Sequence, residues 1–293
     1  STDIWKNSRE YADKVQGTYN ITAFFMKRSF LCSILYSVDR SKGGKAPTAP
    51  AEQEWRNFHM DYNNYNRGYA EPTMTSADYI TRTYRWMALG LLITFAAAFV
   101  TATTPLFYVV NSLYLLFTIA ELALVIVLSA RVQNMSVGAA RGVFLGYALL
   151  NGMVLSYYFL AFDLGTLVLA FLATSLYFGL MAVYGTTTHK DLSGWGPKLM
   201  MALFALIITG FVGVLFGMGF MGTVLYSGIG LVVFMLLTAY DTQKLSQMYS
   251  YYAGDSELAE KASIYGALTL YLDFINIFLY VVRLLGLNSR RRD

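Results

Sequence analysis

The chain has 293 residues, of which 56% are hydrophobic and 14% are charged, and its formal net charge is +4. About a quarter of the residues in a soluble domain are charged, so this composition excludes an ordinary soluble protein and indicates a membrane protein with several spans. The lone Cys32, the isolated His59 and His189, and scattered or terminal basic residues give no indication of a disulfide, a zinc site or nucleic-acid binding.

Residues 1–80 differ from the rest of the chain because they are polar and carry 10 Lys/Arg and 9 Asp/Glu. We predict that they form a mostly disordered N-terminal tail. The apolar patch at 22–38 is too short and too charged to span a membrane. An alternative is that residues 1–59 are translated leader sequence, since codons for residues 54–56 (Glu-Trp-Arg) can form a ribosome-binding site upstream of Met60.

Seven apolar runs follow the tail, and each is close to the length of about 20 residues that crosses the hydrocarbon of a bilayer. The runs are 83–103, 106–130, 140–162, 165–185, 198–217, 221–245 and 263–286. Long apolar segments of this length indicate an α-helical bundle rather than a β-barrel. We therefore predict an all-α membrane protein with a seven-helix transmembrane domain at 81–288 and a basic C-terminal tail at 289–293.

The basic residues between these runs alternate cleanly along the chain. They lie after the second, fourth and sixth runs, as Arg131, Arg141, Lys190, Lys198, Lys244 and Lys261. By the positive-inside rule, these loops and the N-terminus lie in the cytoplasm, and seven spans place the C-terminus outside. The arginines at 290–292 would then lie outside, against the positive-inside rule, so either the last run is re-entrant or the tail is translocated. We favour seven spans.

Two aspartates lie within the last two apolar runs. Asp241 is late in the sixth run and Asp273 is in the middle of the seventh, and the loop between them is centred near residue 255. Two antiparallel helices therefore hold the two carboxyl groups at similar depth. Two carboxylates in contact away from water do not both ionise cheaply, so we expect the pair to share a proton near neutral pH, with at least one raised pKa. Arg131 enters from the same side as a candidate counter-charge.

This arrangement predicts a latch between two helices. Loss of the shared proton adds repulsion, and the opened space favours hard cations such as Ca²⁺, which prefer carboxylate oxygens. Two alternatives stay open. One is a buried ion pair of either aspartate with Arg131 that only fixes helix packing, and the other is an Asp241 that reaches water and pairs with Lys244.

Three further residues are candidates for supporting this site. Asn276 shares a helix face with Asp273, and Tyr240 directly precedes Asp241, although helix packing explains both equally well. Glu121 lies ten residues before Arg131, about 15 Å away along a helix. It is either the outer end of a polar path or a protonated, hydrogen-bonded glutamate.

Enzymatic motifs are not evident. The run "GMGFMG" at 217–222 joins two membrane segments and is better explained by close helix packing and a turn than by dinucleotide binding. An intramembrane aspartyl protease also needs two aspartates, but no glycine lies near Asp273 in the pattern that such proteases use. We expect no enzyme activity.

Three stretches carry a resemblance to a known family. "AELALVIVLSARVQNMS" (120–136), "LLTAYDTQKL" (236–245) and "YGALTLYLDFINIFLYVVRLLG" (265–286) resemble the bacterial branch of the Bax inhibitor-1 family, over about residues 80–288. The resemblance implies six helices around a central C-terminal seventh, in a bacterial cytoplasmic membrane. It also implies a pH-sensitive calcium-leak channel without a cofactor.

The resemblance assigns roles to particular residues. Asp241 and Asp273 form the pH sensor and contact Ca²⁺, Arg131 locks one of them in the closed state, and Glu121 lies on the ion path. Some bacterial relatives instead resemble partners of a membrane-bound AAA protease, engaged through the N-terminal tail. The two functions differ in whether the aspartates or the tail are required.

Overall fold

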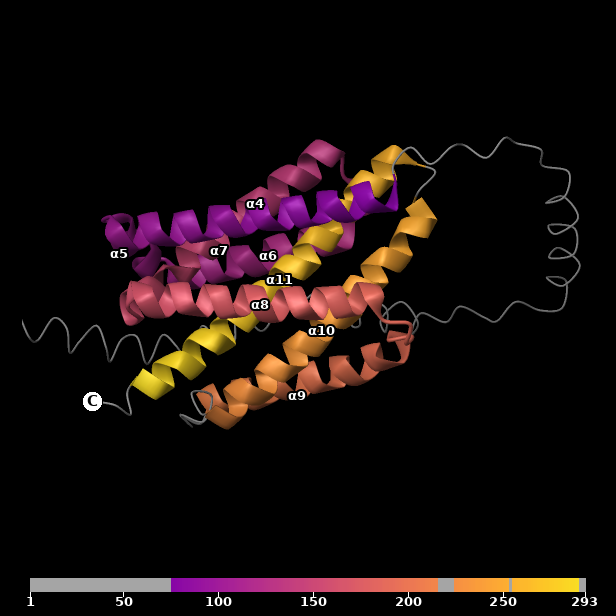
Figure 1. Ribbon diagram of the computed structural model, residues 1–293. Helices are drawn as coiled ribbons and strands as arrows, with labels where there is room; N and C mark the ends of the chain where they lie inside the picture. The colour runs from indigo at the N-terminus through magenta and orange to yellow at the C-terminus, as the bar shows by residue number, and fades with distance from the viewer. Residues whose placement is uncertain (1–74, 216–223, 253–254, 290–293) are drawn as a thin grey trace, which may run out of the picture.

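The computed structural model describes residues 75–215, 224–252 and 255–289 of the chain. These residues form helices joined by short connections, and no strand occurs among them (Figure 1). The elements in chain order are α4 (Ser76–Thr103), α5 (Leu106–Ser112), α6 (Tyr114–Arg131), η1 (Val132–Asn134), α7 (Val137–Ala161), α8 (Leu164–Thr187), η2 (Ser193–Trp195), α9 (Gly196–Leu215), α10 (Val224–Tyr252) and α11 (Ser256–Ser289). The predicted all-helical architecture is confirmed for this part of the chain. The predicted disordered tail, the 217–222 turn and the residues after 289 lie outside it.

The first helix begins earlier than the apolar pattern predicted. The Thr75 hydroxyl accepts a hydrogen bond from the Asp78 amide at 3.1 Å, and the Asp78 carboxylate accepts one from the Thr75 amide at 3.4 Å. This reciprocal capping box satisfies amide groups that a helix start otherwise leaves without partners. Residues 76–80, which we assigned to the tail, therefore form the first turn of α4.

The second apolar run is divided into two helices. We predicted one span at 106–130, but α5 and α6 meet at a bend of 79°. The Ser112 hydroxyl donates back to the Tyr108 carbonyl at 2.9 Å, a bond that competes with regular helix geometry. The Tyr157 hydroxyl donates to Asn111 at 2.7 Å and fastens α5 to α7. Polar side chains at 111 and 112 thus accompany the break.

Five of the described helices are long and apolar enough to cross a membrane, namely α4, α7, α8, α10 and α11, and the bent pair α5–α6 makes a sixth if it is one span. The helix α9 adjoins residues 216–223, which lie outside the described part of the chain. The seven-span count therefore stays a prediction.

The last helix is the most buried of these five. In its apolar stretch 83% of the residues are buried, against 28–56% in the other four helices. It packs chiefly against α4, α7, α8 and α10, and it runs obliquely behind α8 in Figure 1. Contact with four helices is consistent with a central position, while a full ring of six stays a prediction.

Glycines allow two of the helix crossings to be close. A methyl group at Gly152 of α7 would collide with the carbonyl oxygen of Thr94 in α4, and one at Gly185 of α8 would collide with the carbonyl oxygen of Ala239 in α10. Small residues let membrane helices approach to backbone contact. The first crossing also brings the polar side chains of Thr94 and Asn151 to the same level of the bundle.

Candidate functional site

The two predicted sensor residues lie on neighbouring helices and are both buried. Asp241 of α10 is 8% exposed and Asp273 of α11 is 0% exposed, and these two helices pack against each other over much of their length. Burial of a carboxylate without water costs several kcal/mol when it is ionised, so such positions are rarely occupied by chance in a membrane helix. The interface between α10 and α11 therefore carries an unusual concentration of acidic groups for a membrane interior.

A small pocket lies beside Asp241, between α10 and α11. Its volume is about 10 Å³, enough for one water molecule. It is lined by Asp241, Lys244, Leu245, Met248, Tyr265, Gly266, Thr269 and Leu270. Asp241 thus lies level with the turn of α11 that directly precedes Asp273. The pocket extends from Asp241 toward the end of the bundle where α10 and α11 are connected.

The two residues predicted to support the aspartates have structural contacts of their own. The Asn276 amide donates to the Leu272 carbonyl at 2.7 Å within α11, which satisfies a buried polar group locally. The ring of Tyr240 lies against Gly196 at the start of α9, where an added methyl group would meet its hydroxyl at 2.7 Å. Both observations agree with the helix-packing alternative.

The structure does not bring Arg131 to the aspartates. Arg131 is the last residue of α6, its side chain is exposed, and it forms no ion pair with any carboxylate in the described part of the chain. The helix α6 packs mainly against α7, and the chain then turns through η1. The alternative of a static ion pair between Arg131 and either aspartate finds no support in this arrangement.

Glu121 lies at one end of a buried hydrogen-bond network that joins four helices. The Asn151 amide donates to the Glu121 carboxylate, and the Tyr271 hydroxyl donates to the Asn151 carbonyl oxygen at 3.0 Å. The Tyr271 and Thr94 hydroxyl groups are 2.6 Å apart. These four side chains are at most 2% exposed and come from α6, α7, α11 and α4. Glu121 therefore lies near the depth of Tyr271, and its bond from Asn151 agrees with the alternative of a hydrogen-bonded glutamate.

The helix α11 presents its two polar features on different faces. Tyr271 and Asp273 are two residues apart, which corresponds to about 200° around a helix. Tyr271 faces α4 and α7 through its hydrogen bonds, so Asp273 points away from that hydrogen-bond chain. Sequence reasoning missed Thr94, Asn151 and Tyr271. One residue could have pointed to these hydrogen bonds from the sequence, namely Asn151, which is the only residue with an amide side chain in its apolar run.

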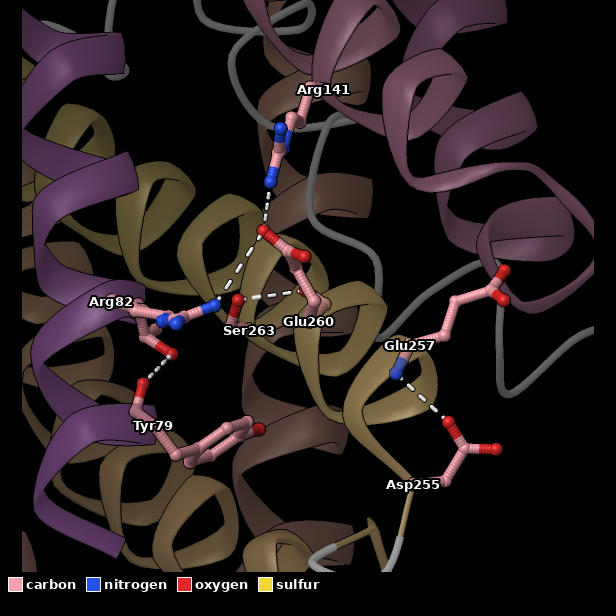
Figure 2. Close-up of polar contacts among 8 residues, drawn as sticks. Tyr79, Arg82, Arg141, Asp255, Glu257, Glu260 and Ser263 are labelled. Atoms are coloured by element: carbon pink, nitrogen blue, oxygen red, sulfur yellow. Dashed lines mark hydrogen bonds and ion pairs between the residues drawn. The ribbon is translucent and has the colours of Figure 1, made fainter. Parts of the chain in front are cut away.

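An ion-pair cluster joins three helices at the end of the bundle that holds the α10–α11 connection, which we call the basic end. Glu260 of α11 contacts Arg141 of α7 and lies 3.8 Å from Arg82 of α4 (Figure 2). The Arg141 guanidinium also lies 5.4 Å from the centre of the Trp86 ring. In the sequence, Arg141 was identified only as one of the basic residues that set the orientation of the protein in the membrane, and Glu260 was not identified.

The carboxylates do not form a ready-made metal site. Among the described residues, no group of three or more His, Cys, Asp or Glu side chains is placed to hold a metal ion.

Comparisons with known proteins agree with the sequence pattern. The family described as "Inhibitor of apoptosis-promoting Bax1" matches residues 76–290. The Inner membrane protein YbhL of Escherichia coli K12 is 40% identical over 222 residues, covering 74% of this chain and 94% of that protein. An uncharacterized protein of Deinococcus radiodurans is 41% identical over 207 residues, covering 70% and 89%. The protein RP147 of Rickettsia prowazekii is 39% identical over 218 residues, covering 73% and 90%. This chain is therefore a membrane protein of the Bax inhibitor-1 family.

Proposed function

We propose that this protein is a proton-sensitive cation leak channel, with Ca²⁺ as its permeant ion and Asp241 and Asp273 as its gate. The observation that carries the proposal is the burial of both carboxyl groups on two helices that pack together. The pocket beside Asp241 adds a place where water and ions approach the pair from the basic end.

The gating chemistry follows from the cost of charge in a membrane interior. Two neighbouring carboxyl groups away from water are most stable when they share a proton. Loss of that proton places two negative charges between α10 and α11 and favours their separation. The separated carboxylates then offer oxygen ligands that suit Ca²⁺. In this scheme Arg131 acts only in a state in which the end of α6 has moved toward the aspartates, because it is exposed here.

The membrane and its sidedness belong to the same proposal. We place the protein in a bacterial inner membrane, supported by its likeness to the inner membrane protein of Escherichia coli. The basic loops support an orientation with the N-terminus and the α10–α11 connection in the cytoplasm. The pocket beside Asp241 then faces the cytoplasm.

Calcium flux into liposomes that contain the purified full chain tests the proposal. The flux is measured from pH 5 to pH 8 for the wild type, Asp241→Asn, Asp273→Asn and the loop control Asp163→Asn. We expect a pH-dependent leak that flattens in the first two variants and persists in the control. Equal effects of Asp273→Asn and Asp163→Asn would remove the site assignment.

A folded, correctly inserted wild type without any leak would instead favour regulation of a membrane AAA protease. Deletion of residues 1–74, which leaves the Thr75 cap and all of α4 in place, should then abolish function, while both aspartate variants remain active. The structure begins to describe the chain at Thr75, so this alternative depends on residues outside the described part.

A further inference from the structure

Lys244 lines the same pocket as Asp241 and lies three residues further along α10, toward the basic end. Its ammonium group is 5.9 Å from the centre of the Tyr240 ring and forms no ion pair with a described carboxylate. The residue is exposed, whereas Asp241 is buried. The alternative in which Asp241 reaches out to pair with Lys244 is therefore not realised here. Lys244 instead places a positive charge at the mouth of a pocket that has a carboxylate at its inner end.

Apart from Asp241, the residues that line the pocket carry no negative charge that could neutralise the Lys244 ammonium group. Leu245, Met248 and Leu270 are apolar, and Asp241 is the one acidic residue among the lining residues. From α11 the pocket receives only the side chains of Tyr265 and Thr269 as polar groups, and the Thr269 hydroxyl already donates to the Tyr265 carbonyl at 3.1 Å. The apolar walls screen charge less than water does, while solvent and salt screen the exposed ammonium group in part, so an ion at the pocket mouth senses a reduced but positive potential.

We propose that Lys244 is a specificity-determining residue: a tethered cation at the pocket mouth that holds divalent cations away from Asp241 more strongly than monovalent ones. The proposal rests on the cation leak proposed above and names a group that limits how fast Ca²⁺ enters it. The Coulomb energy between the ammonium group and an ion doubles when the charge of the ion doubles. If Lys244 slows the entry of K⁺ by a certain factor, it therefore slows the entry of Ca²⁺ by the square of that factor.

A second lysine on the same end of the bundle provides a matched control. The Lys198 ammonium lies 5.7 Å from the centre of the Trp195 ring, nearly the geometry of Lys244 over Tyr240. Lys198 is also exposed, but it does not line the pocket. Substitution of Lys198 changes the charge of the basic end without changing the charge of the pocket mouth.

The first test compares Ca²⁺ and K⁺ flux in liposomes for Lys244→Met, Lys244→Arg and Lys198→Met. We expect Lys244→Met to raise K⁺ flux about threefold and Ca²⁺ flux about tenfold, because the second factor is the square of the first. Lys244→Arg and Lys198→Met should behave like the wild type. An equal rise for both ions indicates general loosening and overturns the proposal, as does a Lys244→Arg variant that matches Lys244→Met.

The second test measures the charge of the pocket mouth without any flux. Met248→Cys, in a Cys32→Ser background, is labelled in detergent with a positively and a negatively charged thiosulfonate reagent. Addition of Lys244→Met should raise the rate with the positive reagent about threefold and lower the rate with the negative reagent by a similar factor. Unchanged rates overturn the role of Lys244 even if the protein leaks. Shifted rates in a protein that never leaks preserve the electrostatic barrier and remove the proposed channel function.

Discussion

The hydroxyl groups of Thr94 and Tyr271 lie 2.6 Å apart, and this contact joins α4 to α11, the most buried of the five described spanning helices. Tyr271 continues the chain to Asn151 and so to Glu121. Since all four side chains are at most 2% exposed, water does not replace a partner that is removed. These hydrogen bonds should therefore contribute measurably to the free energy of unfolding.

Tyr271→Phe removes the hydroxyl that contacts both Thr94 and Asn151. We expect the free energy of unfolding to fall by about 1–2 kcal/mol, because the Asn151 carbonyl oxygen loses a buried donor and the Thr94 hydroxyl keeps only its backbone partners. Thermal unfolding in detergent, followed by circular dichroism, measures the change. Tyr184→Phe is the control, since Tyr184 is 45% exposed on the outer face of α8. Equal effects of the two substitutions would contradict the role of the chain.

Asn151→Leu removes the donor to Glu121 and leaves that carboxyl group buried without its partner. Glu121→Gln keeps a side-chain oxygen that accepts from the Asn151 amide. We therefore expect Asn151→Leu to lower the unfolding temperature clearly more than Glu121→Gln does. The combined variant Asn151→Leu/Glu121→Leu should lose less stability than the sum of its single changes. Strict additivity in this cycle would show that the two side chains do not interact.

Gly152→Ala places a methyl group against the backbone of α4 at Thr94. The helices must separate to accept it, so we expect a loss of 1–3 kcal/mol, about the cost of overpacking a core. Gly142→Ala in the same helix is the control, because nothing lies within 4 Å of its added methyl group. That control should be neutral or slightly stabilising, since alanine favours helix. Thermal unfolding of both variants in one detergent decides the comparison.

Glu260→Gln removes the acid shared by Arg82 and Arg141 (Figure 2). These arginine side chains are 46% and 40% exposed, so we expect a loss below about 1 kcal/mol that shrinks as salt is added. Unfolding temperatures at low and high salt measure it. Glu257→Gln, which disrupts a pair with Lys261 on one helix, should change stability less because it joins no second helix. A salt-independent loss would contradict an ion-pair origin.

Asp163 should be insensitive to pH across the range of the flux experiment. Hydrogen bonds from the Thr166 hydroxyl and the Thr166 amide lower the pKa of the Asp163 carboxyl group below its usual value. A lowered pKa contributes stability that is complete above the pKa of an unfolded aspartate, about 3.9, and is lost as the pH falls through the folded value. Asp163→Asn should therefore leave the profile between pH 5 and pH 8 unchanged. A shifted profile would show that this helix cap is coupled to the gate.

The sequence alone predicted the helices and the two acidic positions because both signals are strong. Apolar runs of spanning length are rare outside membranes, and a charge within one stands out. The start of α4 was missed because Thr75 and Asp78 act through a local cap that hydropathy does not register. The division between α5 and α6 was missed because only Asn111 and Ser112 interrupt the run at the bend, too few polar residues to divide it by hydropathy.

The buried hydrogen-bond chain was harder to predict for a different reason. Threonine and tyrosine are common in membrane helices, so Thr94 and Tyr271 carry no signal until their helices are placed together. Their meeting depends on the α4–α7 crossing at Gly152, a tertiary contact. The exposed position of Arg131 likewise depends on where α6 ends relative to α11, which spacing along the chain does not fix.

The burial of α11 has a consequence for biogenesis. This helix follows the other described helices in the chain, so ribosomes complete it after the helices against which it packs. Until then Thr94 and Asn151 lack their Tyr271 partner, and Arg82 and Arg141 lack Glu260. Unsatisfied polar groups are costly in lipid, so the earlier helices remain an open, partly hydrated assembly or stay with the insertion machinery. Release into the bilayer as a bundle with these contacts formed awaits the translation of α11.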